Sequence, residues 1–265
     1  MSEIPRLKDK VLNCPILIAT SNDFLPLLKP FAFLFNEFWS PRQKVTFLGY
    51  ESPTFSLPKN FDFVSLGYQR GVKHWANDIL PYIEKLNYDY FSYTAEDMFL
   101  AREVNFEALD LLLQKCRTLD TPPGRAALGD SVSMQNNIPC PQEQNFILQT
   151  SDSQYRLSLQ WSLWRKDYFL KYLHPDYSQW DFEVKNMEIA KSDGENIVGL
   201  KENYPLGFCN ASVTGGNTEN LNFENTVFDF TDICSARDRS KRKKVEQEYI
   251  TKMVDLGLIS KENLK

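Results

Sequence analysis

The stretch "YDYFSYTAEDMFL", residues 88–100, places two adjacent acids directly after a short, strongly apolar run. The run from Tyr88 to Tyr93 has the length and aromatic content of a buried strand. Glu96 and Asp97 interrupt it, and apolar character returns at once with Met98. The question that this stretch raises is why a buried strand ends in a pair of carboxylates.

The chain upstream and downstream of this stretch predicts an alternation of strands and helices. Three further apolar runs have the length of strands: residues 14–20, 44–50 and 61–67. Three stripes of apolar residues at three- and four-residue steps predict helices: residues 24–38, 72–86 and 106–116. This alternation over the first 117 residues favours an α/β layer with a largely parallel sheet. In such sheets ligands gather beyond the carboxyl ends of the strands, which is where Glu96 and Asp97 lie.

The second half of the chain is less regular. Residues 117–142 are rich in Pro, Gly, Ser and Asn and predict a loop or a set of turns. Beyond it we expect paired strands, then short helices and finally an amphipathic helix: residues 145–150 and 155–164, 165–173 and 180–191, and 240–259. The sequence therefore predicts a single domain over residues 1–235 and a C-terminal helical extension over 236–265.

Composition excludes several classes of protein. A net charge of −5 argues against a general nucleic-acid binder, and no apolar segment approaches the length of a membrane helix. The polar N-terminus and five widely spaced cysteines without a CxxC motif predict a cytoplasmic protein with reduced thiols. Two histidines without a Cys/His cluster make a zinc site improbable, and no GxGxxG, Walker A or GxSxG motif occurs.

Adjacent acids at a strand end have two interpretations. They can hold a hard divalent cation such as Mg²⁺ or Mn²⁺, which prefers oxygen ligands and can neutralise a diphosphate. Alternatively, Glu96 or Asp97 caps a following turn and stays solvated. The spacing alone favours the capping interpretation, because adjacent acids are common.

The segment 157–183 combines tryptophans with polar side chains. It contains Gln160, Trp161, Trp164, Trp180, Asp181 and Glu183. Tryptophan offers a flat apolar face suited to a sugar ring, and a carboxylate beside it can accept a proton from an attacking hydroxyl. The alternative places the tryptophans in the core and the acids in the first turn of a helix, whose dipole favours them there.

Several segments resemble one family. The string Y-x-x-x-Y-T-A-E-D-M-F-L resembles the region of GT-A glycosyltransferases that carries the DxD motif. "SLQWSLWRKDYFLKYL…YSQWDFE" is similar to a pattern in polysaccharide-linked bacterial and viral glycosyltransferases, in which an L-Q-x-x-L/I-W-[KR]-[KR] run precedes W-[DE]-F-E. "KHWANDILPYIEKLNYDYFSY" and "YPLGFCNASVTGGN" match the same group. The resemblance covers most of residues 14–217.

The resemblance implies a nucleotide-sugar donor, bound by the half of about residues 1–117. Asp97 matches the last acid of DxD and Glu96 its middle position, which would make them the metal and diphosphate residues. Ala95 stands at the position of the first acid, so two alternatives stay open. Either Mg²⁺ or Mn²⁺ binds through Asp97 and Glu96, or cationic side chains neutralise the leaving diphosphate. Thr20, Ser21, Asn22 and Lys73 are further candidates for donor contact; helix capping is the alternative for Ser21 and Asn22.

The resemblance also implies transfer to a sugar-like acceptor, bound by the half of about residues 143–235. Asp181 and Glu183 match the acids of W-[DE]-F-E, and by analogy one of them is the general base. A single displacement with such a base inverts the anomeric configuration. Trp180 would be the acceptor platform, with Gln160 and Trp164 as further acceptor residues.

The basic run over residues 237–244 has two interpretations. It is a solvated loop and helix start, or it contacts an anionic membrane surface, which would suit a lipid-linked acceptor. Two other functions remain alternatives to sugar transfer. A nucleotidyltransferase also uses a strand-end acid and a metal, although "ATSNDFLPLLKP" lacks the expected Gly-rich basic loop. A non-catalytic carbohydrate-binding protein of the same fold is consistent with Ala95. The sequence makes no prediction of oligomeric state.

Overall fold

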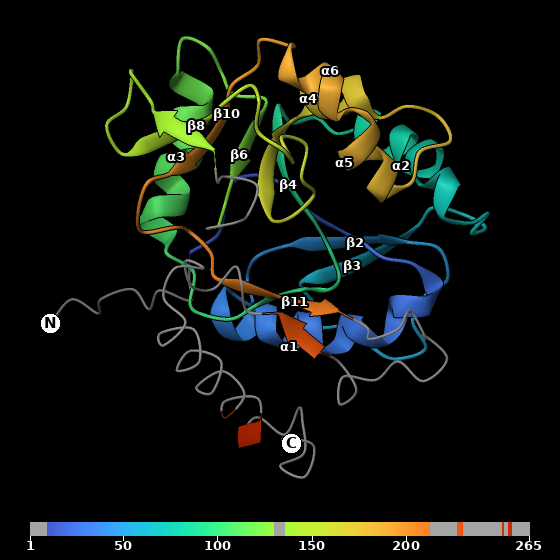
Figure 1. Ribbon diagram of the computed structural model, residues 1–265. Helices are drawn as coiled ribbons and strands as arrows, with labels where there is room; N and C mark the ends of the chain where they lie inside the picture. The colour runs from blue at the N-terminus through green and yellow to red at the C-terminus, as the bar shows by residue number, and fades with distance from the viewer. Residues whose placement is uncertain (1–9, 130–135, 213–226, 230–250, 252–253, 256–265) are drawn as a thin grey trace, which may run out of the picture.

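The computed structural model describes residues 10–129, 136–212, 227–229, 251 and 254–255 (Figure 1). Its centre is a nine-stranded sheet with the order β3-β2-β1-β4-β9-β6-β10-β8-β7. These strands are β1 (Ile16–Ala19), β2 (Val45–Gly49), β3 (Phe61–Ser65), β4 (Tyr90–Ala95), β6 (Arg125–Ala127), β7 (Asn137–Pro139), β8 (Phe146–Gln149), β9 (Ser162–Arg165) and β10 (Ile197–Leu200). A smaller sheet joins β5 (Met98–Leu100), β11 (Phe208–Ser212) and β12 (Val227–Asp229) in the order β12-β11-β5.

The strand directions make the large sheet mostly parallel. Strands β3, β2, β1 and β4 are parallel neighbours, as are β6 and β10. Strands β9 and β8 run against their neighbours. The carboxyl ends of β1, β2, β3, β4 and β6 therefore open on the same edge. The predicted α/β class, with a mostly parallel central sheet flanked by helices, is confirmed.

Helices cover both faces of the sheet. They are η2 (Asn22–Leu27, 3₁₀), α1 (Leu28–Phe38), η3 (Val72–His74, 3₁₀), α2 (Trp75–Glu84), α3 (Phe106–Thr118), α4 (Lys166–Tyr172), α5 (Gln179–Lys185) and α6 (Met187–Lys191). Side chains of β1 alternate between two cores, as the pleat requires. Ile16 and Ile18 pack with α1 and α3, whereas Leu17 and Ala19 pack with α2, α4 and α5. The small sheet lies beside α1, on the lower side of Figure 1.

Two expectations for the second half are wrong. The predicted strand 155–164 begins only at Ser162, and it does not pair with 145–150: β9 pairs with β4 and β6, while β8 pairs with β7 and β10. The predicted loop 117–142 contains β6, a central strand of the sheet. Periodicity missed β6 because it is three residues long and begins with Arg125, which is fully buried and donates hydrogen bonds to Ser162 Oγ and the Arg156 carbonyl.

Several predicted features lie outside the described residues. They are the basic run at 237–244, the domain boundary at residue 235 and nearly all of the C-terminal extension over 236–265. The division of residues 1–235 into two halves stays a prediction. Within the described part of the chain, no helix has the length and apolar character needed to cross a membrane.

Gly124, which precedes β6, gives a stability prediction. A Cβ atom at this position would lie 2.5 Å from the ring of Tyr168, a buried residue of α4. Because both groups are enclosed, Gly124→Ala is expected to lower the free energy of unfolding by about 1–3 kcal/mol. Urea denaturation would measure this loss, with Gln114→Ala on the exposed face of α3 as the control. Unchanged stability of the glycine variant would contradict the close packing of α4 on β6.

Candidate active site

The acidic pair forms a two-residue turn between the two sheets. Strand β4 ends at Ala95, Glu96 and Asp97 make the turn, and β5 begins at Met98. The Glu96 amide donates to the carbonyl of Ala19 at the end of β1, which anchors the turn to the edge of the large sheet. The carboxylates are therefore fixed at the carboxyl edge, where the sequence predicts a ligand site.

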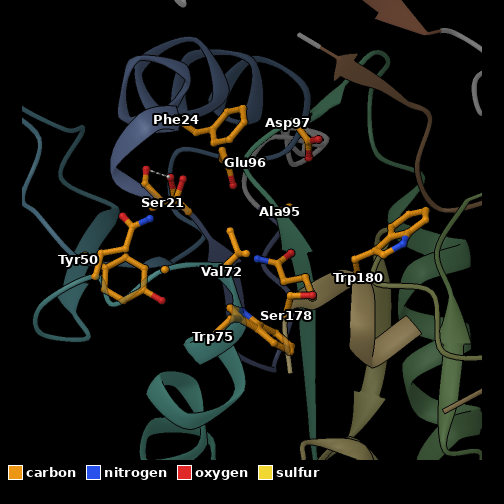
Figure 2. A pocket seen from close by; sticks show the side chains of 14 residues that line it. Ser21, Phe24, Tyr50, Val72, Trp75, Ala95, Glu96, Asp97, Ser178 and Trp180 are labelled. Atoms are coloured by element: carbon orange, nitrogen blue, oxygen red, sulfur yellow. Dashed lines mark hydrogen bonds between the residues drawn. The ribbon is translucent and has the colours of Figure 1, made fainter. Parts of the chain in front are cut away.

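A cavity of about 400 Å³ opens in front of this turn. It is lined by the ends of β1, β2 and β4, by the segment after β3 and by the starts of α2 and α5: Thr20, Ser21, Phe24, Tyr50, Gln69, Gly71, Val72, Trp75, Ala95, Glu96, Asp97, Ser178, Gln179 and Trp180. Figure 2 shows Tyr50 and Trp180 on opposite sides of this cavity, with Ala95 between them. We refer to it as the first cavity.

A second cavity, of about 510 Å³, adjoins the first. It is lined by Ala95, Asp97, Met98, Tyr155, Ser158, Leu159, Gln160, Gln179, Trp180, Glu183 and Asn210. Four residues, namely Ala95, Asp97, Gln179 and Trp180, line both cavities. Trp180 is 66% exposed, so its indole is available to a ligand in either cavity. The shared turn and the shared start of α5 make the two cavities parts of one site.

Helix α5 separates the two acids of the "WDFE" block. Phe182 is buried against Trp75, Trp164 and Phe169, which fixes the rotation of the helix. Residues two apart on a helix point in nearly opposite directions. Glu183 therefore lines the second cavity, while Asp181 lines neither.

Asp181 has a local structural role. It forms a capping box with Ser178, in which each side chain accepts a hydrogen bond from the backbone amide of the other residue, and it pairs with Lys185 one turn later. The hydrogen bonds from Lys185 and Ser178 hold the pKa of Asp181 below its usual value. A carboxylate engaged in this way is a weak proton acceptor.

Glu183 differs from Asp181 in its position and in the direction of its pKa shift. Its Oε1 accepts a hydrogen bond of 2.6 Å from the Leu159 amide, which orients the carboxylate. Burial raises the pKa of Glu183, and the hydrogen bond from the Leu159 amide and the charge of the buried Arg125 only partly offset this effect. A raised pKa makes the carboxylate a better proton acceptor than an ordinary glutamate.

Glu96 and Asp97 are desolvated acids. Glu96 is 6% exposed, and burial together with the charge of Asp97 raises its pKa well above the usual value. Burial raises the pKa of Asp97 to about 6, with a further contribution from Glu183. Among the described residues, neither acid forms an ion pair, and the Asp97 Oδ1 atom is buried without a hydrogen-bond partner. Desolvation and mutual repulsion disfavour the charged forms of these two acids, and a bound cation would stabilise those forms.

These two acids fit a divalent cation in part. Carboxylate oxygens are the ligands that Mg²⁺ prefers, and Mg²⁺ is commonly held by one or two carboxylates together with substrate phosphates. The orphaned Oδ1 atom of Asp97 is a free ligand of this kind. The described residues contain no group of three or more His, Cys, Asp or Glu side chains arranged to hold a metal, so the protein would supply only part of the coordination.

The remaining predicted residues divide between the site and its surroundings. Thr20 and Ser21 line the first cavity and Gln160 lines the second, while their roles as donor and acceptor residues stay predictions. Asn22 does not line them: its side chain accepts from the Glu51 amide and its own amide donates to Gln69 Oε1. Lys73 is exposed on η3 and lines neither cavity.

Trp164, expected to contact an acceptor, instead lies in the core between α4 and α5. It is fully buried, stacks on Tyr168 and lies against the guanidinium of Arg125 at 5.6 Å. The reason is the alternation along β9, which directs Trp164 to the face of the sheet that α2, α4 and α5 cover. Core was the alternative that the sequence left open for this residue.

Sequence reasoning missed several cavity residues. Tyr50 and Gln69 follow β2 and β3 and so occupy the same kind of position as Thr20 after β1. The strand ends were visible in the sequence and could have identified both residues. Asn210 and Tyr155 carried no such signal, because they reach the second cavity only through the folding of the second half of the chain.

The comparisons with known proteins rest on structure. No protein-family model matches the sequence, and no curated protein matches it. The structure of S. aureus TarS 1–349 in complex with UDP-GlcNAc matches 92% of this chain and 73% of its own, with 8% identity and a TM-score of 0.50. TarS 1–349 without that ligand matches 74% of this chain with 10% identity and a TM-score of 0.48. This chain spans 60% of the length of that structure.

A third solved structure is the mannosyltransferase PcManGT from Pyrobaculum calidifontis, in complex with GDP-Man and Mn²⁺. It matches 71% of this chain and 53% of its own, with 11% identity and a TM-score of 0.42. At identities this low, structural likeness concerns the fold and not the activity. The chain has the mixed α/β fold of the TarS 1–349 complex with UDP-GlcNAc.

Proposed function

We propose that this chain is a glycosyltransferase that moves a sugar from a nucleotide-sugar donor to a saccharide-type acceptor with inversion. The observation that carries the proposal is the pair of adjoining cavities at the carboxyl edge of the sheet. Ala95, Asp97 and the exposed Trp180 line both cavities. Glu183 lines the second cavity and not the first. A two-substrate transfer needs this arrangement: two binding spaces that meet at the reacting carbon.

The first cavity suits the donor. Its walls are mainly apolar and aromatic, and they lie at the end of β1 beside the acidic turn. A nucleoside fits between Phe24, Tyr50 and Trp75, and its diphosphate would then lie near Glu96 and Asp97. UDP-GlcNAc and GDP-Man are bound by proteins of similar structure, which is consistent with a donor of this class.

Glu96 and Asp97 are the residues that would hold Mg²⁺ or Mn²⁺. When bound, such an ion would neutralise the negative charge that develops on the departing diphosphate. The two carboxylates themselves repel a diphosphate, so without a cation the acidic turn opposes donor binding. We therefore propose that donor binding depends on the metal, although Ala95 stands at the position of the first acid of DxD.

Glu183 is proposed as the general base of the second cavity. The acceptor hydroxyl oxygen forms a bond to the anomeric carbon, and its proton passes to the Glu183 carboxylate. The bond from the anomeric carbon to the diphosphate oxygen breaks, and its electron pair leaves with the nucleoside diphosphate. Attack from the second cavity, opposite the first, inverts the configuration. The Leu159 amide keeps the carboxylate in place.

The experiment that tests this proposal measures release of nucleoside diphosphate from a panel of nucleotide sugars, with Mn²⁺ or with EDTA. Slow transfer to water makes the reaction visible without the natural acceptor. We expect release from at least one UDP- or GDP-sugar with Mn²⁺, and a large loss of release with EDTA.

Other outcomes would identify the alternative functions. Pyrophosphate release from a nucleoside triphosphate and a sugar phosphate would indicate a nucleotidyltransferase. Binding of sugars without any turnover would indicate a carbohydrate-binding protein that kept the fold. Either result would replace the proposed function.

A further inference from the structure

The amide side chain of Gln69 has one end fixed and one end free. The Asn22 backbone amide donates to Gln69 Oε1 at 2.9 Å. A backbone N–H can only donate, so the atom facing it is the oxygen of the side-chain amide. The nitrogen of Gln69 therefore points elsewhere, and the side chain lines the first cavity. Among the described residues, no hydrogen bond from this nitrogen is found.

The position of Gln69 is set by contacts among three loops. Asn22 follows β1, Glu51 follows β2 and Gln69 follows β3. The Asn22 side chain accepts from the Glu51 amide at 3.0 Å, while its backbone amide holds Gln69. The segments that follow β1, β2 and β3 are thus linked through Asn22, and Gln69 cannot reverse its amide without losing its hydrogen bond to the Asn22 amide.

The aromatic residues that line the first cavity near Gln69 favour a ligand with a flat ring. The Tyr50 hydroxyl donates to Asp78 Oδ2 at 3.1 Å, and Arg70 pairs with the same carboxylate. This keeps the Tyr50 ring at the cavity, where Phe24 and Trp75 also lie. Gln69 lines the same cavity as these three rings, so its side-chain nitrogen is available to a base bound among them.

From this geometry we propose that Gln69 selects nucleotides whose base carries a carbonyl group on the edge it meets, as uracil and guanine do, over adenine. The proposal rests on the donor role of the first cavity. The Gln69 nitrogen offers only hydrogen-bond donors. The exocyclic position at which uracil and guanine carry an accepting carbonyl oxygen carries an amino group in adenine, which is itself a donor, so the discrimination applies where Gln69 meets that exocyclic position. A donor facing a donor leaves both groups unpaired, which costs binding free energy.

The experiment measures dissociation constants of UDP, GDP and ADP by calorimetry with Mn²⁺ present, for the wild-type chain and for Gln69→Glu. Glutamate keeps an oxygen for the Asn22 amide but offers no donor to the base. We expect the wild type to bind UDP or GDP at least about tenfold more tightly than ADP, the effect of one mispaired hydrogen bond. In Gln69→Glu the ratio of the dissociation constant of ADP to that of UDP or GDP is expected to fall to about threefold or less.

Gln114→Glu is the matched control, because Gln114 is exposed on α3 and lines neither cavity. It should leave the ratio unchanged, and thermal denaturation of Gln69→Glu should confirm that the variant is folded. Wild-type affinity for ADP within about threefold of both UDP and GDP would overturn the proposal, as would a ratio that survives in folded Gln69→Glu. If no nucleotide binds, with or without Mn²⁺, the donor role of the first cavity fails instead.

Discussion

Replacing Glu183 with glutamine is expected to lower turnover of the nucleotide sugar by a factor of about 10²–10⁴, the usual contribution of a general base. The amide retains an oxygen for the Leu159 amide, so the shape of the second cavity is kept. It cannot accept the proton of the attacking hydroxyl. Release of nucleoside diphosphate measures the loss, and the affinity for the nucleoside diphosphate should stay within about twofold of wild type.

Asp181→Asn is the matched control on the same helix. Asp181 completes the capping box of α5 from the third helical residue and pairs with Lys185, and it lines neither cavity. Its replacement is expected to lower the free energy of unfolding by at most about 1 kcal/mol, because a negative charge near the helix N-terminus and an ion pair one turn apart are lost. Turnover should change little. The assignment of the base is wrong if Asp181→Asn loses turnover as severely as Glu183→Gln does.

Replacing Asp97 with asparagine is expected to have opposite effects on stability and on donor binding. The variant removes a charge that has no cation partner among the described residues and that lies close to Glu96 and Glu183. In the free protein at neutral pH, the midpoint of thermal denaturation should rise, by roughly 2–4 °C for each kcal/mol gained. The affinity for UDP or GDP with Mn²⁺ should fall by about tenfold to a hundredfold, because a charged ligand to the cation is lost.

The pH dependence of stability supplies an independent measurement on Asp97. Burial raises the pKa of this acid from 3.8 to about 6, so its folded-state pKa lies above the unfolded value. The folded protein then holds its proton more tightly, and the stability from this group is lost as pH rises through about 6. Asparagine does not titrate. The stability of Asp97→Asn relative to wild type should therefore increase between about pH 4 and pH 7, and a constant difference across this range would contradict the desolvated state of Asp97.

Local sequence was sufficient for the parallel half of the fold. The strands at 16–19, 45–49, 61–65 and 90–95 are short apolar runs, and the helices between them carry regular apolar stripes. The periodicity of apolar residues and the local composition depend only on residues near each other in the chain, so the sequence alone reveals them. The same local pattern placed Glu96 and Asp97 at a strand end, and the parallel sheet put that end on the same edge as Thr20 and Ser21.

The partition of roles within "WDFE" depended on tertiary structure. Spacing made Asp181 and Glu183 equivalent candidates, and only the burial of Phe182 against Trp75 set the rotation that brings Glu183 to a cavity. The same holds for Arg125, which reads as part of a loop until hydrogen bonds to Ser162 and Arg156 make it a buried strand residue. The sequence by itself determined the strands and helices of the parallel half and the edge of the sheet at which the acidic turn lies. The tertiary structure decided which side chains line the two cavities, because packing between distant segments fixes the rotation of a helix and the pairing of a short strand.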